Sequence, residues 1–321
     1  MSKKKQFEAP EWVGQNLYIR PSYIVSMPDY WVPWKMPSQA FLDNTVNLDD
    51  NDHAGKISMK ADKKLRNAIN WLICASEPKK VFHSLTGRWF DFKVNFITLT
   101  LPDTDAPVSE HDFKTKLLNP WLTLMRKYHG LKNYVWKLEF QKNGKLHLHI
   151  TSDTFIHYAI IKKSWNKLLA SNAMLTRFAR EHGHLNPNST DIHSVRKVRD
   201  LGAYLAKYMT KDPGLRKKIR GRIWGCNYEL SRANTTKVFI SRDQCSTEMK
   251  QLFQKGIEWA TIKTPGTEFE PGRNIGEIFY LKYTDWRDKL TGTIKQVFTD
   301  TIAGLKNLYH DGTLYPDLLR V

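Results

Sequence analysis

The sequence of 321 residues has few cysteines and no long apolar stretch. Its three cysteines lie far apart, so they offer neither a disulfide framework nor the paired spacing of a cysteine zinc site. No segment approaches the roughly 20 apolar residues that a membrane-spanning helix needs, and the first residues, MSKKKQFEAPEW, lack the apolar region of a signal peptide. These absences predict a soluble, intracellular protein in which a metal would be held by histidines and carboxylates.

Acidic residues are scarce relative to basic ones. Fifty lysines and arginines face 32 aspartates and glutamates, which gives a formal net charge of +18 at pH 7. Such a surplus favours a polyanionic partner, because neutralised phosphates release condensed counterions on binding. The apolar and aromatic content is still sufficient for a core. We therefore expect a globular protein whose first candidate partner is nucleic acid.

We expect three regions along the chain. Residues 1–60 mix prolines with tyrosines and tryptophans, which prevents long helices and predicts an irregular N-terminal wrap. Residues 61–222 alternate between strand and helix patterns, and residues 223–321 have the pattern of a mixed α/β appendage that ends in a helix.

The central region predicts the order β-β-α-β-β-α-β-α over residues 80–211. A hairpin should turn at Thr86-Gly87, and a change of apolar parity predicts a bulge or bend near Phe96. Pro120 cannot lie in an uninterrupted helix interior, so we expect Asn119 to cap a new helix that begins with this proline. Strands joined by short turns predict an α+β fold, with a central, mainly antiparallel sheet and flanking helices.

A histidine pair stands out in the segment GKLHLHITS. His147 and His149 alternate with aliphatic residues, so a strand would place both imidazoles on one face, where they can share a cation. Without further context, such a pair is more often two polar residues on an exposed face. His182 and His184 have the same spacing, but they lie among glycine, proline and asparagine where a helix ends, so we assign them to solvent. His193, in a predicted strand, is a candidate auxiliary group.

The turn that precedes the histidine strand decides whether a carboxylate joins this face. A two-residue turn at Asn143-Gly144 would pair Phe140 with His147 and would direct Glu139 to the opposite face. A three-residue turn with Gly144 in the left-handed conformation would instead pair Glu139 with His147, and Lys137 with His149.

We favour the three-residue turn, because it alone brings a carboxylate to the two histidines. His147, His149 and Glu139 would then form a nitrogen and oxygen ligand set that suits Mg²⁺ or Mn²⁺ acting on phosphate. Gln141 shares the parity of Glu139 and could contribute instead.

The segment DLGAYLAKYMTKD predicts a helix with two different stripes. Tyr204, Lys207, Tyr208 and Lys211 have spacing i, i+3, i+4 and i+7, whereas Leu201, Leu205 and Met209 form a separate apolar stripe. The tyrosines could be packing residues at the edge of the core. Alternatively, the two phenols and two lysines form a nucleophile face, since nearby positive charge lowers the pKa of a phenol and attracts a phosphodiester.

Three segments in chain order carry a family resemblance: FITLT at 96–100, HLH at 147–149 and YLAKYMTK at 204–211. They resemble the three motifs of the His-hydrophobe-His (HUH) superfamily of rolling-circle replication initiators. The two-tyrosine spacing is similar to that of replication-associated proteins of single-stranded DNA phages of the filamentous and microvirus kind. The resemblance covers residues of about 90–211 and leaves both ends of the chain unexplained.

The resemblance implies an HUH endonuclease domain with a ferredoxin- or RRM-like palm. It implies these roles: His147, His149 and Glu139 as ligands of Mg²⁺ or Mn²⁺, Tyr204 and Tyr208 as nucleophiles, and Lys207 and Lys211 as the lysines of the tyrosine motif. The implied reaction nicks single-stranded origin DNA, leaves a 5′-phosphotyrosine and a free 3′-hydroxyl, and can later rejoin DNA ends. The implied setting is a bacterial host's cytoplasm, with the host helicase and polymerase as partners and no membrane.

Two other classes of function remain open. A transposase or relaxase would use the same chemistry, although two nucleophiles favour replication. A non-catalytic, basic nucleic-acid-binding protein would use its aromatic residues to stack on bases. A basic segment beside Trp224 could track a DNA backbone or could be a solvated charge run; it comprises Arg216, Lys217, Lys218, Arg220 and Arg222.

Overall fold

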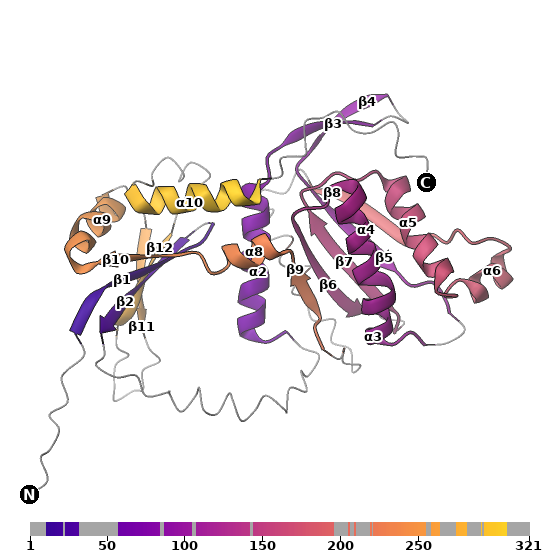
Figure 1. Cartoon of the computed structure of the whole chain (residues 1–321), viewed down its shortest axis with the longest axis horizontal. Helices are drawn as coiled ribbons and strands as arrows, with labels where there is room; N and C mark the ends of the chain where they lie inside the picture. Colours follow the sequence, from indigo (N-terminus) through magenta and orange to yellow (C-terminus); the bar gives the residue numbers. More distant parts are fainter. Residues whose placement is uncertain are drawn as a thin grey trace, which may run out of the picture. The chain divides into compact units, whose positions relative to one another are not determined.

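The computed structural model divides the chain into two compact units. Residues 1–51 and 235–302 form one unit, and residues 52–234 and 303–321 form the other. Figure 1 labels their helices and strands. The structure describes residues 11–21, 23–31, 57–83, 87–104, 107–141, 144–195, 205, 209, 219, 221–254, 258–263, 274–280, 290 and 292–306.

The first unit contains a five-stranded sheet with the order β10-β1-β2-β12-β11, in which all paired neighbours are antiparallel. Its strands are β1 (Glu11–Ile19), β2 (Tyr23–Trp31), β10 (Lys237–Ser241), β11 (Glu258–Lys263) and β12 (Asn274–Tyr280). Helix α9 (Arg242–Gln254) packs against β1 and β10. Helix α10 (Gly292–Leu305) follows the sheet in sequence.

The irregular wrap predicted for residues 1–60 is wrong for residues 11–31, which form two paired strands. The prolines are accommodated at permissive places. Pro21 lies between the strands, and Pro28 lies in β2 beyond Ser26, the last residue that β12 pairs with, so no second neighbour there needs its missing N–H. Residues 223–321 are likewise no separate appendage, because their strands share this sheet with β1 and β2.

The second unit contains the sheet of the predicted central region, with the order β8-β5-β7-β6-β9 and antiparallel pairing throughout. Its strands are β5 (Val94–Thr100), β6 (Tyr134–Phe140), β7 (Leu146–Ser152), β8 (Thr190–Val195) and β9 (Trp224–Cys226). The predicted α+β fold with antiparallel strands and flanking helices is therefore confirmed.

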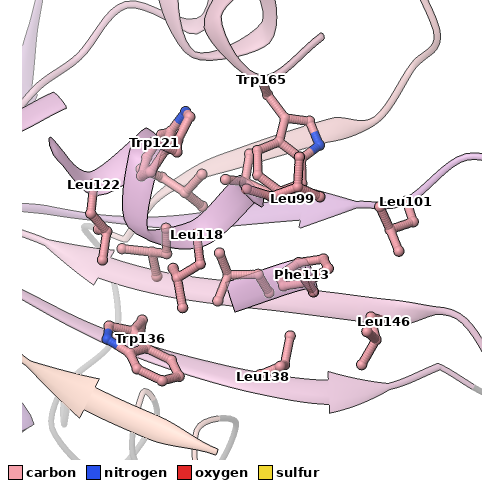
Figure 2. Close-up of a cluster of buried hydrophobic side chains, with 14 of the residues drawn as sticks. Leu99, Leu101, Phe113, Leu118, Trp121, Leu122, Trp136, Leu138, Leu146 and Trp165 are labelled. Carbon is pink, nitrogen blue, oxygen red and sulfur yellow. The ribbon is translucent and has the colours of Figure 1, made fainter. Parts of the chain in front are cut away.

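Helices cover one face of this second sheet. The helical segments are α3 (Glu110–Asp112), η1 (Phe113–Leu118), α4 (Asn119–His129), α5 (Tyr158–Ser171) and α6 (Thr176–His182). Figure 2 shows Phe113, Trp121 and Trp165 packed with sheet residues such as Leu99 and Leu138 in one buried cluster. The strand period of two sends every second side chain to this core and leaves the alternate ones on the other face.

Pro120 changes the geometry of the helix without ending it. The chain passes from a π-helical segment, η1, into α4, and the Asn119 N–H bonds to the carbonyl of Lys114, five residues earlier. Pro120 lies in the first turn of α4, where it needs no N–H, as predicted. Asn119 has helical dihedrals, however, and is not the extended N-cap residue that the sequence predicted.

A two-stranded ribbon precedes the second sheet. Helix α2 (Met59–Ala75) leads into β3 (Lys79–His83), which pairs with β4 (Arg88–Phe92) next to Gly87, whose φ is +64°. The predicted bend lies at Lys93, between β4 and β5, three residues before the position predicted at Phe96. The unit also contains α8 (Tyr228–Ala233). Within the described ranges, no helix is long and apolar enough to cross a membrane.

Candidate functional site

The β6–β7 hairpin has the register that brings a carboxylate to the histidines. The Gln141 N–H donates to the Lys145 carbonyl at 2.8 Å, and the Gly144 N–H donates to the Gln141 carbonyl at 2.8 Å. Gly144 is left-handed, with φ +79°. Glu139 is thereby paired with His147, and Lys137 with His149, so the predicted three-residue turn is confirmed.

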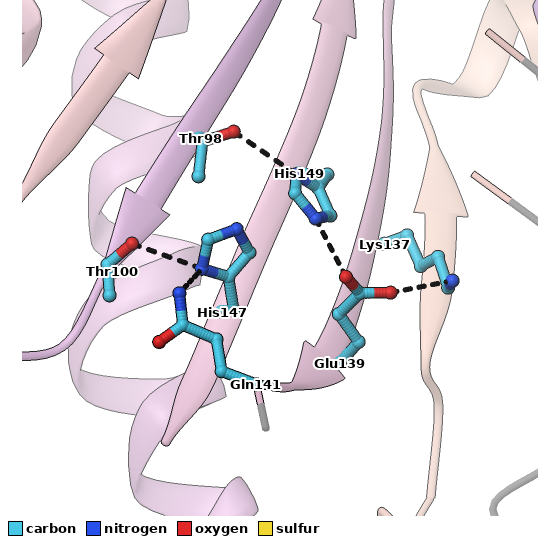
Figure 3. A network of polar contacts seen from close by, with 7 residues as sticks. All are labelled: Thr98, Thr100, Lys137, Glu139, Gln141, His147 and His149. Atoms are coloured by element: carbon cyan, nitrogen blue, oxygen red, sulfur yellow. Dashed lines mark hydrogen bonds and ion pairs between the residues drawn. The ribbon is translucent and has the colours of Figure 1, made fainter. Parts of the chain in front are cut away.

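A polar face forms on the side of the sheet that is opposite the helices. Strand β7 alternates between buried aliphatic residues and the half-buried His147 and His149. Strand β5 adds Thr98 opposite His149 and Thr100 opposite His147. We call this surface the histidine face; its central members are Thr98, Thr100, Lys137, Glu139, Gln141, His147 and His149 (Figure 3).

Contacts on three sides hold the His149 ring. Its Nε2 lies 2.9 Å from Oε1 of Glu139, and its Nδ1 lies 3.2 Å from Oγ1 of Thr98. The Phe96 ring stacks on it, with 5.0 Å between centroids and 26° between planes. Phe96 therefore belongs to the histidine face, which accounts for the change of apolar parity seen in the sequence.

His147 has a different set of partners. Its Nδ1 lies 3.1 Å from Oγ1 of Thr100 and also contacts the amide nitrogen of Gln141. Its ring centroid is 4.3 Å from that of His149. Gln141, the predicted alternative ligand, thus lies on the histidine face beside His147.

Glu139 links His149 to a buried lysine. The Nζ of Lys137 donates to Oε2 of Glu139 at 2.8 Å, while Oε1 of the same carboxylate contacts His149. Lys137 is only 3% exposed, so its charge is compensated by a carboxylate in a setting with little water. Both oxygens of Glu139 are consequently held in place.

The surroundings determine the charges of two site residues. Burial alone would raise the pKa of Glu139, but the hydrogen bond from His149 and the charge of Lys137 outweigh it and lower the pKa to about 2. Burial, together with the neighbouring His149, lowers the pKa of His147 to about 4. At neutral pH, Glu139 is a carboxylate and His147 is a neutral imidazole, which are the forms that bind metal ions.

The donor atoms fit a divalent cation in chemistry and partly in spacing. Adjacent ligands of an octahedral Mg²⁺, each about 2.1 Å from the ion, lie about 3 Å apart, and Oε1 of Glu139 is 2.9 Å from Nε2 of His149. In the part of the chain that the structure describes, no three histidine, cysteine or acidic side chains converge as a formed metal cluster. The structure thus brings Glu139 and His149 together, with His147 alongside.

Strand β8 extends the histidine face at its edge. Asp191 pairs with Thr98, and His193 pairs with Phe96. His193 Nε2 lies 2.7 Å from Oδ2 of Asp191, and both side chains are exposed. The predicted auxiliary residue His193 is therefore on the same face as the histidine pair, together with an acid that the sequence reasoning missed.

The other missed members of the site are Thr98, Thr100 and Lys137. Their signal was the alternation of Phe96, Thr98 and Thr100 with buried aliphatic residues, which marks them as neighbours on one face only once β5 is known to pair with β7.

The second histidine pair is a surface feature, as predicted. Helix α6 ends at His182, Gly183 is left-handed, and both His182 and His184 are exposed.

The predicted nucleophile residues Tyr204, Tyr208, Lys207 and Lys211 lie outside the described residues, as do Arg216, Lys217, Lys218 and Arg220 of the basic segment. Leu205 and Met209 are described; both are helical and fully buried, as predicted for the apolar stripe of that helix. Arg222 is exposed and donates its Nε–H to the carbonyl of Trp224 at 3.0 Å.

Comparison with known proteins gives one result for this region. Residues 94–213 match a family model described as replication-associated protein, of the ORF2 and gene 2 protein type. The matched range begins with β5 and contains the histidine face of β5, β6 and β7 as well as both tyrosines. No curated protein and no solved structure matches the chain. The match indicates a replication-associated protein.

Proposed function

We propose that this protein is a rolling-circle replication initiator that nicks single-stranded origin DNA with a tyrosine at a metal site. One observation carries the proposal: Glu139, His147 and His149 share one face, with the carboxylate 2.9 Å from a histidine nitrogen. The match to replication-associated proteins supports the biological setting. The positive charge of the chain supports a DNA substrate.

The residues of the histidine face have distinct roles in this proposal. His147, His149 and Glu139 hold Mg²⁺ or Mn²⁺, which when bound would polarise the scissile phosphate and stabilise charge on its oxygens. Thr98 and Thr100 orient the two imidazoles through Nδ1. Lys137 orients Glu139 through Oε2.

The covalent step exchanges one phosphodiester bond for another. The oxygen of Tyr204 or Tyr208 forms a bond to phosphorus and loses its proton, while the bond from phosphorus to the 3′-oxygen breaks and that oxygen takes up a proton. The products are a 5′-phosphotyrosine and a free 3′-hydroxyl. Because no phosphodiester energy is lost, the reverse reaction can join DNA ends without ATP.

Two nucleophiles suit a replication cycle. The first tyrosine stays attached to the 5′ end after initiation, so a second is needed for the cleavage that releases a unit-length product. Positions i and i+4 are neighbours on one helix face, so both phenols can reach one phosphate. We place Tyr208, between the two lysines, as the first to act. The free 3′-hydroxyl would serve a host polymerase, assisted by a host helicase, in a bacterial cytoplasm.

The test is a cleavage assay with the full chain and single-stranded oligonucleotides tiled across the cognate genome. We expect one sequence to be nicked in Mn²⁺ or Mg²⁺ and the 5′ end to stay attached to the protein after denaturation. A chelator must abolish the reaction. Cleavage that persists in the chelator would refute the metal site, and tight binding without any nick would favour a non-catalytic nucleic-acid-binding protein. Mapping the nick also separates an origin from a transposon end.

A further inference from the structure

The β3–β4 ribbon has two faces of different character. Its register pairs Phe82 with Trp89 on one face and Val81 with Phe90 on the other. Figure 1 shows the ribbon extending beyond the five-stranded sheet of its unit. The face of Val81 is packed against the protein, and the face of Phe82 is turned to solvent, so the two faces need different explanations.

The inner face already anchors the ribbon. Val81 and Phe92 are buried, and the rings of Phe90 and Phe92 meet that of Phe155 edge-on at 5.3 and 5.5 Å. Phe155 lies just beyond the end of β7, the strand of the histidine pair. Folding of the ribbon therefore does not require aromatic residues on the outer face.

The outer face nevertheless carries two large rings. Phe82 is 46% exposed and Trp89 is 60% exposed, and their centroids lie 5.3 Å apart. Leaving both rings in water forfeits the free energy of burying them, which is about 1.5–3 kcal/mol for a side chain the size of phenylalanine. Such a pair on an exposed ribbon marks an interaction surface.

The charges around the pair identify the kind of partner. Among the described residues, the ribbon carries Lys79, Lys80 and Arg88 against a single acid, Asp91, and both Lys80 and Arg88 are exposed. Aromatic rings combined with cations are the pattern of single-stranded nucleic-acid surfaces, where bases stack on rings and cations neutralise phosphates.

We propose that the outer face of the β3–β4 ribbon binds single-stranded DNA by stacking unpaired bases on Phe82 and Trp89. The inference rests on the proposed function only in taking DNA as the substrate. A ribbon also fits the major groove of duplex DNA. Paired bases inside a duplex cannot stack on these rings, however, so the exposed pair favours a single strand.

The connection to the histidine face determines which part of the DNA is held. Strand β4 continues into β5 through Lys93, and nine residues of extended chain, at most roughly 30 Å, separate Trp89 from Thr98. The ribbon would therefore hold DNA several nucleotides away from the cut, where it adds affinity without touching the reacting phosphate. Long oligonucleotides should gain from the ribbon, and short ones should not.

The experiment compares the wild-type full chain with the double variant Phe82→Ser/Trp89→Ser by fluorescence anisotropy of a labelled 40-nucleotide single strand. Stacking is worth about 1–3 kcal/mol per base, so we expect binding to weaken at least about fivefold. The control is Tyr128→Ser/Tyr158→Ser, which removes two other exposed rings of the same unit and should change affinity less than twofold. A second variant, Phe82→Leu/Trp89→Leu, keeps apolar side chains and should lose the same affinity.

The outcomes are separable. A double variant that binds the long single strand within twofold of wild type overturns the inference, as does a loss confined to duplex DNA. A wild-type dimer that the variant dissociates would assign the surface to a second copy and would also overturn it. Wild-type protein that neither binds nor nicks DNA would instead refute the proposed function. With the ribbon inference correct, the double variant still nicks a short oligonucleotide at the wild-type rate when saturated.

Discussion

The carboxylate oxygen Oε1 of Glu139 lies 2.9 Å from Nε2 of His149, although the strand register places Glu139 opposite His147. The carboxylate thus reaches diagonally across the hairpin, while Lys137, directly opposite His149, holds its second oxygen at 2.8 Å. This diagonal contact joins both histidine positions to one acid. It is the relationship on which the following predictions depend.

Replacing the first histidine should separate cleavage from binding. We expect His147→Ala to lower nicking below detection while DNA affinity falls only a few fold, because a chain with net charge +18 binds DNA without the metal. Nicking and anisotropy assays on the same oligonucleotide measure the two effects. The matched control is His182→Ala, from the exposed pair of identical spacing. Equal losses of cleavage and binding would indicate a structural role for His147.

The two threonines should act as positioning residues. Thr98→Val and Thr100→Val keep the side-chain shape but remove the hydroxyls that contact Nδ1 of the histidines. We expect each to weaken the apparent Mn²⁺ affinity in the nicking assay by about 10- to 100-fold. Serine at either position should restore most of it. Valine variants with unchanged Mn²⁺ dependence would show that these hydroxyls do not orient the ligands.

Phenylalanine substitutions test the two-nucleophile model, because they remove only the phenolic oxygen. Tyr204→Phe and Tyr208→Phe should each still form a covalent adduct with some origin oligonucleotide, and the double variant should form none. Adducts are counted on denaturing gels with labelled DNA. The model is wrong if one single variant is inactive and the other matches wild type in both nicking and termination.

The buried Lys79 should make stability depend on pH. Burial lowers its pKa from 10.5 to about 8, even though Asp153 opposes the shift. Between these values the unfolded chain binds the proton and the folded chain does not, so the free energy of unfolding rises with pH in this window and is lower below pH 8. Relative to Lys79→Met, wild type should gain up to about 3 kcal/mol between pH 8 and pH 10.5.

Urea denaturation at several pH values measures that difference. Lys80→Met, at the exposed neighbouring position, serves as the control and should leave the pH dependence of wild type unchanged. A constant difference between wild type and Lys79→Met over the whole range would show that Lys79 is not desolvated in the folded protein.

Local patterns in the sequence determined much of the second unit. The alternation around His147 and His149 specifies a strand with one polar face, because successive side chains of a strand point to opposite sides. Gly144 permits a left-handed residue in the turn, and the choice of a three-residue turn determines that Glu139 faces the histidines. The order of strands and helices and the resumption of helix at Pro120 follow from equally local rules.

Only the tertiary structure decided which distant segments meet. Strand β5 supplies Thr98 and Thr100 to the histidines because it pairs with β7, some fifty residues away, and no periodicity announces that pairing. The hairpin of residues 11–31 likewise joins strands from beyond residue 235 in one sheet. Backbone hydrogen bonds between strands are the same for any pair of residues, so the partner of an edge is chosen by packing of the whole chain, which a local sequence pattern does not contain.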